Sequence, residues 1–194
     1  MAISFPISLP SGGIKQITMV VVSKTSMSTS PFTGQQQVYS HPNEHWKAEI
    51  LLAQMERADS EPWIAALATM RGMYGTMLLG DPAGATPQGT VSGSPVVDGA
   101  SQTGFELDIK SMTGTFKAGD YIQLSNYLYK IVKDHSGATG TLEIWPRLRA
   151  SPADASAITY TNAKGLFRLT TTESPFTYVS PELASIQFSV MEAI

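Results

Sequence analysis

The stretch Ala58–Pro82, ADSEPWIAALATMRGMYGTMLLGDP, decides the fold because it contains the one strong helix signal in the chain. Asp59 or Ser60 is suited to cap a helix start, since a short polar side chain there accepts a hydrogen bond from a first-turn amide. Gly72 is a typical residue just past a helix end. Between these signals, apolar residues recur at helical spacing and form one stripe: Trp63, Ala66, Leu67 and Met70. The pattern predicts a helix over about residues 60–71.

The remainder of the chain has the pattern of β-structure. Residues 76–79 (TMLL) form a short apolar run that Gly80-Asp81-Pro82 closes, which indicates a buried strand. Residues 46–52 alternate between apolar and polar side chains, as expected of a strand with one face on a core. Further strands are predicted at residues 17–23, 35–39, 105–109, 121–124, 128–132, 142–145, 166–171, 177–179 and 186–190. The sequence therefore predicts a mainly β fold that carries one α-helix.

Changes in composition along the chain indicate how the strands are grouped. Residues 1–16 contain Pro6, Pro10 and a Ser-Gly-Gly turn, and are predicted to be an N-terminal arm. Residues 84–151 begin with a Gly/Ser/Pro-rich stretch and continue with closely spaced short strands, which favours a small β-barrel. The helix region has too few apolar strands to close a core alone. We therefore predict a discontinuous β-sandwich domain, residues 17–83 plus 152–194, with the barrel inserted into it.

Composition excludes several classes of function. The chain has 194 residues, of which 42% are hydrophobic and 15% are charged, against roughly 25% charged in typical soluble domains. The net charge of −3 and the lack of a Lys/Arg cluster argue against nucleic-acid binding. The chain has no cysteine, so disulfides and cysteine nucleophiles are excluded. No apolar run approaches the ~20 residues of a membrane span, and the N-terminus lacks the pattern of a secretory signal. We expect a protein made in the cytosol that does not insert into a membrane.

The segment His41-Pro42-Asn43-Glu44-His45 matches H-x-x-E-H, a zinc-protease pattern. That chemistry needs both histidines on one face of a helix, and Pro42 disfavours helix at His41. We interpret the segment as a polar turn between strands and predict no metal site, no cofactor and no enzymatic activity. A tail-associated hydrolase using His41, Glu44 and His45 remains the enzymatic alternative. Asp108 and Asp120 could face each other on the barrel, but carboxylates on a solvated strand edge are the more common case.

The three tryptophans raise the question of sugar binding, because exposed aromatic rings stack on sugars. Trp63 lies on the helix stripe and Trp46 on an alternating strand, so both are predicted to be core residues. A carbohydrate-binding module remains the alternative function, with Tyr127, Tyr129 and Trp145 as the candidate platform.

Several segments together resemble a family of phage proteins. They are residues 46–49 (WKAE), the helix with Trp63 ending in residues 70–72 (MRG), and residues 75–82 (GTMLLGDP), 117–124 (KAGDYIQL), 129–132 (YKIV) and 144–149 (IWPRLR). In this order they resemble the distal tail proteins of bacteriophages with long non-contractile tails, over roughly residues 15–194. The resemblance implies a β-sandwich with a helix, a second β-domain and a homo-oligomeric ring, typically a hexamer. Such a ring joins the tail tube protein to the tail-tip hub or baseplate in the virion.

On this hypothesis the function is assembly. Edge strands and the N-terminal arm would pair with the sheets of neighbouring subunits, where main-chain hydrogen bonds give strength. Apolar residues in segments predicted to be unpaired are the candidate assembly contacts: Phe5, Pro31 and Phe32.

Overall fold

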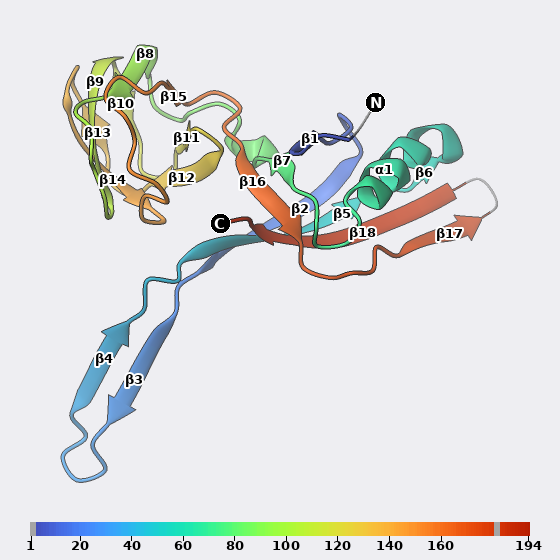
Figure 1. Cartoon of the computed structure of the whole chain (residues 1–194), viewed down its shortest axis with the longest axis horizontal. Coiled ribbons are helices and arrows are strands. Elements are labelled where there is room, and N and C mark those ends of the chain that lie inside the picture. The colour runs from blue at the N-terminus through green and yellow to red at the C-terminus, as the bar shows by residue number, and fades with distance from the viewer. Residues whose placement is uncertain (1–2, 181–182) are drawn as a thin grey trace.

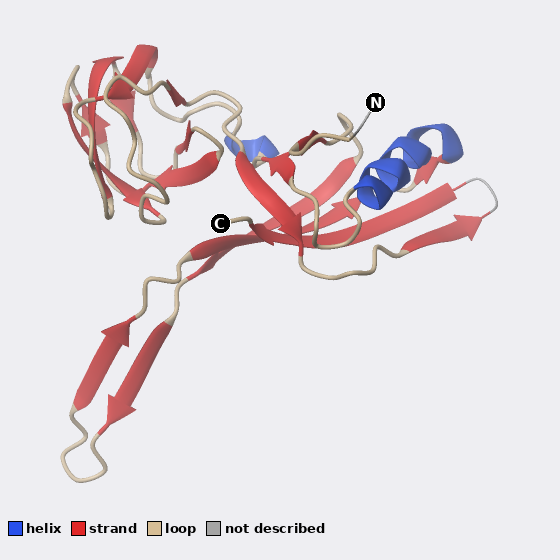
Figure 2. Cartoon of the chain, viewed as in Figure 1, coloured by secondary structure: helices blue, strands red, loops and turns tan. Residues whose placement is uncertain are grey.

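The protein is built almost entirely of β-strands, as a computed structural model shows for residues 3–180 and 183–194 (Figures 1 and 2). The strands form two main sheets and a separate projecting hairpin. Within the described residues there is one α-helix. The predicted mainly β fold with one helix and a barrel-like sheet is confirmed.

The first sheet has eight strands and contains the strand that follows the helix. Its main order is β1 (Ile7–Ser8), β7 (Met77–Leu79), β16 (Gly165–Leu169), β18 (Leu183–Glu192), β5 (His45–Leu52) and β2 (Ile14–Val22). β1 is parallel to β7, and the other neighbours are antiparallel. The first residues of β18 pair with β6 (Met55–Glu56) and with β17 (Phe176–Ser180). The alternation predicted over residues 46–52 is confirmed, because Trp46, Ala48, Ile50 and Leu52 all face the core.

The helix α1 (Arg57–Thr69) packs its apolar stripe on this sheet. Trp63 and Leu67 are buried, and the Trp63 ring lies 6.3 Å from that of Phe188 on β18. The predicted start was wrong: the N-cap is Glu56, which makes no side-chain capping bond. The helix ends at Thr69, two residues before the predicted end, with Met70 as its C-cap; Arg71 and Gly72 follow with positive φ (52° and 68°).

The second sheet closes almost completely on itself. Its order is β15 (Ile158–Thr159), β11 (Tyr121–Leu124), β12 (Tyr127–Ile131), β14 (Gly140–Trp145), β9 (Glu106–Thr113) and β8 (Ser92–Val97). Main-chain hydrogen bonds between Val97 and residues 155–156 bring its two edges together. A short pair, β10 (Thr115–Phe116) and β13 (His135–Ser136), lies beside it, and the 3-10 helix η1 (Pro82–Gly84) follows β7. Because β15 belongs to this sheet, the chain returns to the first sheet at β16 and not at residue 152 as predicted.

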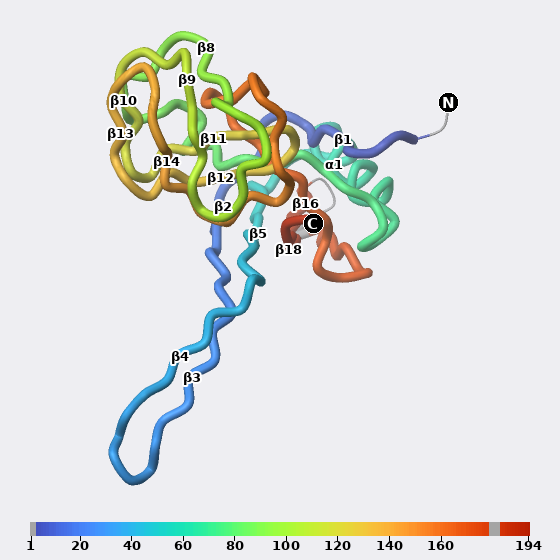
Figure 3. The backbone as a smooth tube through the Cα atoms, turned by 60° about the vertical axis from the view of Figure 1, so that its left-hand side comes forward, coloured from blue at the N-terminus to red at the C-terminus, as the bar shows by residue number. Residues whose placement is uncertain are grey.

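A long hairpin leaves the first sheet and extends away from both cores (Figures 1 and 3). Its strands are β3 (Thr25–Thr29) and β4 (Gln36–Ser40), which pair with each other along their full length. It continues from the antiparallel pair β2 and β5. The strand predicted at residues 35–39 corresponds to β4, but no strand was predicted at the position of β3. The Ser/Thr-rich strand β3 was missed because all of its residues are exposed, so it has no buried face to produce an apolar alternation.

The N-terminal segment is not a free arm. β1 pairs with β7, and β2 already begins at Ile14. Residues 1 and 2 of the predicted arm lie outside the described residues, as do residues 181 and 182 of the predicted sandwich domain.

Candidate functional site: a buried polar network and a projecting hairpin

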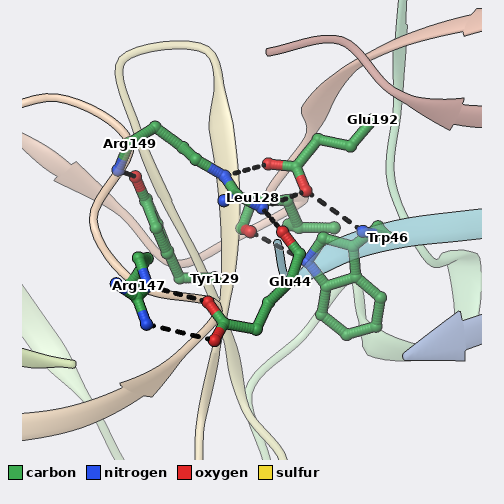
Figure 4. A network of polar contacts seen from close by, with 7 residues as sticks. All are labelled: Glu44, Trp46, Leu128, Tyr129, Arg147, Arg149 and Glu192. Atoms are coloured by element: carbon green, nitrogen blue, oxygen red, sulfur yellow. Dashed lines mark hydrogen bonds and ion pairs between the residues drawn. The ribbon is translucent and has the colours of Figure 1, made fainter. Parts of the chain in front are cut away.

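A network of charged side chains joins the two main sheets (Figure 4). Glu44 precedes β5 and Glu192 ends β18, so both belong to the first sheet. Arg147 and Arg149 follow β14 of the second sheet. The two glutamates are 4% and 5% exposed. Buried charges are tolerated only when they are paired and hydrogen-bonded, so the arrangement of these four groups must be well defined.

Each arginine binds one glutamate through two hydrogen bonds. Arg147 donates from Nε and Nη2 to the carboxylate of Glu44, at 2.9 and 3.3 Å. Arg149 donates from the same two atoms to Glu192, at 2.9 and 2.7 Å, and also reaches the Glu44 carbonyl. Such bidentate pairs fix the orientation of both side chains as well as their separation. The network therefore sets how the second sheet sits on the first.

Trp46 connects this network to the apolar core. Its main-chain amide donates to Glu192 Oε2 at 3.0 Å, and its indole Nε1 donates to the Leu128 carbonyl on β12, also at 3.0 Å. Its ring packs edge-on against Trp145, with centroids 4.6 Å apart. Trp46, a residue of the first sheet, thus donates a side-chain hydrogen bond to the main chain of the second sheet.

The predicted sugar platform is not exposed as a surface. Tyr129 is buried to 1% exposure, and its hydroxyl accepts a hydrogen bond from the Arg149 amide at 3.1 Å. Burial raises the pKa of Tyr129 to about 12, so the phenol stays protonated. Trp145 packs against Trp46, and Tyr127 packs against the second core. These three residues therefore cannot present stacked, accessible rings to a sugar, and this prediction is corrected.

The H-x-x-E-H segment leads from β4 into β5, and its residues have different surroundings. His41 is exposed and its Nε2 lies 3.0 Å from the Ser26 hydroxyl. Glu44 binds Arg147, and His45 is 8% exposed. Burial and the nearby Lys47 lower the pKa of His45. The segment was predicted to be a polar turn between strands; His45 instead begins β5, and both Glu44 and His45 are buried. In the part of the chain that the structure describes, no three His, Asp or Glu side chains come together as a metal site.

Asp120 is buried and holds main-chain amides, which was not predicted from the sequence. It is 3% exposed and accepts hydrogen bonds from the amides of Gln88, Gly89 and Lys117 at 2.7 to 3.3 Å. Asp108 instead accepts from the Thr141 hydroxyl on the exposed side of β14. Asp120 thus holds loop amides, Asp108 bonds a neighbouring strand, and the two carboxylates do not form an acid–base pair.

The candidate assembly contacts fall into two groups. Phe5 is half-buried, packs on the first core and lies edge-on to Tyr74 at 6.0 Å, so its prediction as a free contact was wrong. Pro31 and Phe32 lie in the turn at the end of the hairpin, and Phe32 is 95% exposed. Of the three candidate assembly contacts, only Pro31 and Phe32 at the end of the hairpin are therefore exposed to a partner.

The hairpin carries further exposed apolar side chains. Met27 and Val38 are opposite each other on one face and are each 63% exposed. Tyr39, on the other face, is 65% exposed. From Thr25 to Ser40 the sequence contains no charged residue. Surfaces that remain exposed to solvent normally carry many charged side chains. The exposed apolar residues and the lack of charge in this hairpin are instead typical of a contact surface.

Comparison with known proteins adds no identification: neither a family model nor a curated protein matches this chain. Over residues 3–180 and 183–194, no helix is long and apolar enough to cross a membrane.

Proposed function

We propose that this protein is a structural component of a phage tail tip, a distal tail protein that forms a ring between the tail tube protein and the tail-tip hub. The proposal rests on the segments that resemble this family and on one observation, the uncharged hairpin β3–β4. The protein acts in the virion, assembles through its own subunits and catalyses no reaction.

The hairpin supports self-assembly because it is hard to explain in an isolated subunit. A two-stranded hairpin without a packed face is marginally stable in water. Here every residue of both strands is exposed, and three large apolar side chains have no core to pack on. Contact with another subunit removes this apolar surface from water, which stabilises the hairpin and the assembly together.

The edge strand β2 supports the same conclusion. β2 borders the first sheet and has a partner, β5, on one side only. Val20 and Val21 on it are 39% and 55% exposed. Free edges with apolar side chains invite strand pairing, and a closed ring covers them in every subunit.

Light scattering coupled to size exclusion tests the proposal. We expect a mass of several subunits, six times 20.8 kDa for a hexamer, and rings of uniform size in negative-stain images. A monomer at every accessible concentration, with no ring in the images, would contradict the proposal.

A further inference from the structure

We propose that residues 3–10, here called the strap, exchange between neighbouring copies of the chain, so that the strap of one subunit occupies the site beside β7 in the next. This inference rests on the proposed self-assembly and names a contact that links the subunits. It is carried by the way the strap is bound and by the short segment that joins it to β2.

The strap occupies a defined site on the first sheet. β1 pairs in parallel with β7, and the Ile7 amide donates to the Thr76 carbonyl at 2.9 Å. Phe5, Ile7 and Leu9 pack against the first core. A Cβ at Gly75 would come within 2.5 Å of the Phe5 ring, so the missing side chain at Gly75 makes room for this ring. The structure thus shows what covers this site, and the strap of a second copy fits it equally well because its sequence is the same.

The strap is held less firmly than the other parts of the first sheet. Its ladder with β7 contains only Ile7 and Ser8, whereas β2 pairs with β5 along Ile14–Val22. Its apolar side chains, those of Phe5, Ile7 and Leu9, are half-buried. Segments with few buried contacts open locally at a low cost in free energy. The strap can therefore leave its site while the antiparallel strands of the sheet stay folded.

Residues 11–13 (Ser-Gly-Gly), here called the hinge, connect the strap to β2 and are exposed. Gly12 and Gly13 have φ angles of 84° and 80°. Glycine adopts positive and negative φ about equally readily, so the hinge can turn back, as it does here, or straighten. Residues 10–12 also line two cavities, of about 520 and 230 Å³, so little packing opposes this movement.

Exchange requires that neighbouring subunits are already held together. An isolated subunit keeps its own strap, because a tethered segment meets its site at a far higher effective concentration than a second molecule provides. Subunits held side by side through the hairpin remove this difference. The strap then makes the same contacts in either copy, and a substantial fraction is exchanged. From Pro10 to Ile14 the chain spans at most about 14 Å, so exchange brings the neighbour's β7 close to the start of β2.

The strap and the hairpin leave opposite ends of β2. The hinge precedes Ile14, and the hairpin strand β3 follows Val22 (Figure 1). A subunit therefore contacts its neighbours at two separate places. Exchange from each subunit to the next links a ring, whereas mutual exchange between two subunits closes a dimer.

The absence of cysteine makes disulfide trapping a direct test. Ser8 and Leu78 are partners in the β1–β7 ladder, where a disulfide between cysteines is geometrically feasible. A tagged Ser8→Cys chain is co-expressed with an untagged Leu78→Cys chain, and the purified protein is mildly oxidised. Within one chain each cysteine faces a wild-type residue, so a tagged–untagged disulfide dimer forms only by exchange. We expect several-fold more of this dimer than with Val132→Cys in place of Leu78→Cys, because Val132 is exposed but lies outside the first sheet; equal yields would overturn the proposal.

Gly12→Ala tests the hinge in the double variant Ser8→Cys/Leu78→Cys. In this variant, straps bound to their own chain give monomers with an internal disulfide, and exchanged straps give linked chains. No atom lies within 4 Å of a Cβ added at Gly12, but a positive φ is costly for alanine. The substitution therefore penalises the turned-back hinge, and we expect the ratio of linked chains to monomers to rise about two- to tenfold.

Gly99→Ala is the matched control for the hinge variant. Gly99 has a φ of 88° and equally open surroundings, but it lies between β8 and β9 of the second sheet. It should leave the ratio unchanged. No increase with Gly12→Ala, or an equal increase with both substitutions, would contradict the role given to the hinge.

The outcomes separate this inference from the proposed function. Rings in which the double variant Ser8→Cys/Leu78→Cys forms only internal disulfides would overturn the exchange and leave the ring intact. Exchanged disulfides in dimers, with no rings, would support the exchange and overturn the ring. Monomers with internal disulfides alone would overturn both.

Discussion

Arg149 and Glu192 form an ion pair whose side chains are only 5% and 2% exposed, at the junction of the two main sheets. Arg149→Met leaves the Glu192 carboxylate buried without its cation. Removing one partner of a buried pair typically costs about 3–5 kcal/mol. We expect a loss of this size in the free energy of unfolding, measured by urea titration.

Two further variants control this measurement. Adding Glu192→Gln to Arg149→Met removes the uncompensated charge but keeps an acceptor for the Trp46 amide, so much of the lost stability should return. Glu61→Gln breaks an exposed pair with Arg57 and should change stability by no more than about 1 kcal/mol. Equal effects of the buried and exposed substitutions would contradict the role given to the network.

His45 gives a second prediction at the residue scale, the pH dependence of stability. Its pKa in the folded protein is lowered, first by burial and then by Lys47, so the unfolded chain binds the proton more readily. Neutral His45 therefore contributes its full stability above the ordinary pKa of about 6.5, and this contribution is lost as the pH falls below that value. We expect the Tm of His45→Gln to fall less between pH 7.5 and pH 5 than that of the wild type.

The exposed His41 serves as the matched control. His41→Gln should show the wild-type decrease in Tm over the same pH range. If both variants behave alike, the acid sensitivity arises elsewhere in the protein.

The separate elements show where sequence reasoning succeeds and where it fails. β5 and α1 were found because each has one buried face, which imposes a period of two or of 3.6 residues on the sequence. β3 has no buried face, so no such pattern arises. The polar network was missed for another reason: Glu44 and Arg147 are 103 residues apart, and nothing local in either segment marks the other as its partner.

The hairpin is the element whose removal should separate folding from assembly. Replacing Thr25–Ser40 with an Asn-Gly turn removes residues that are exposed in the subunit, apart from the half-buried Ser30 in the turn. We expect the free energy of unfolding of the monomer to change by no more than about 1 kcal/mol. Self-association, measured by sedimentation velocity, should be lost.

Val132→Ser is the control for this deletion, because Val132 is a 51% exposed apolar residue outside the hairpin. It should leave self-association unchanged. A hairpin deletion that still forms rings would show that the strand edges alone hold the subunits together.

At the scale of the whole molecule, the two sheets form a fixed body and the hairpin reaches beyond it. The buried arginine–glutamate pairs lock the second sheet against the first, so a contact made by one sheet defines the position of the other. A ring needs such subunits, because a variable angle between the sheets would prevent a constant rotation from one subunit to the next. In the proposed ring, the hairpin is the element that extends to the neighbouring subunit.

This division of roles predicts that thermal stability depends on protein concentration. Subunits that bind each other only when folded are stabilised by mass action, so the Tm of the wild type should rise as the protein concentration rises. The Tm of the hairpin-deleted chain should stay constant over the same range, because its subunits no longer associate. Differential scanning calorimetry over about a hundredfold range of concentration tests both expectations. A constant Tm for the wild type would mean that association does not stabilise the folded subunit, and a concentration-dependent Tm for the deleted chain would place the main contact outside the hairpin.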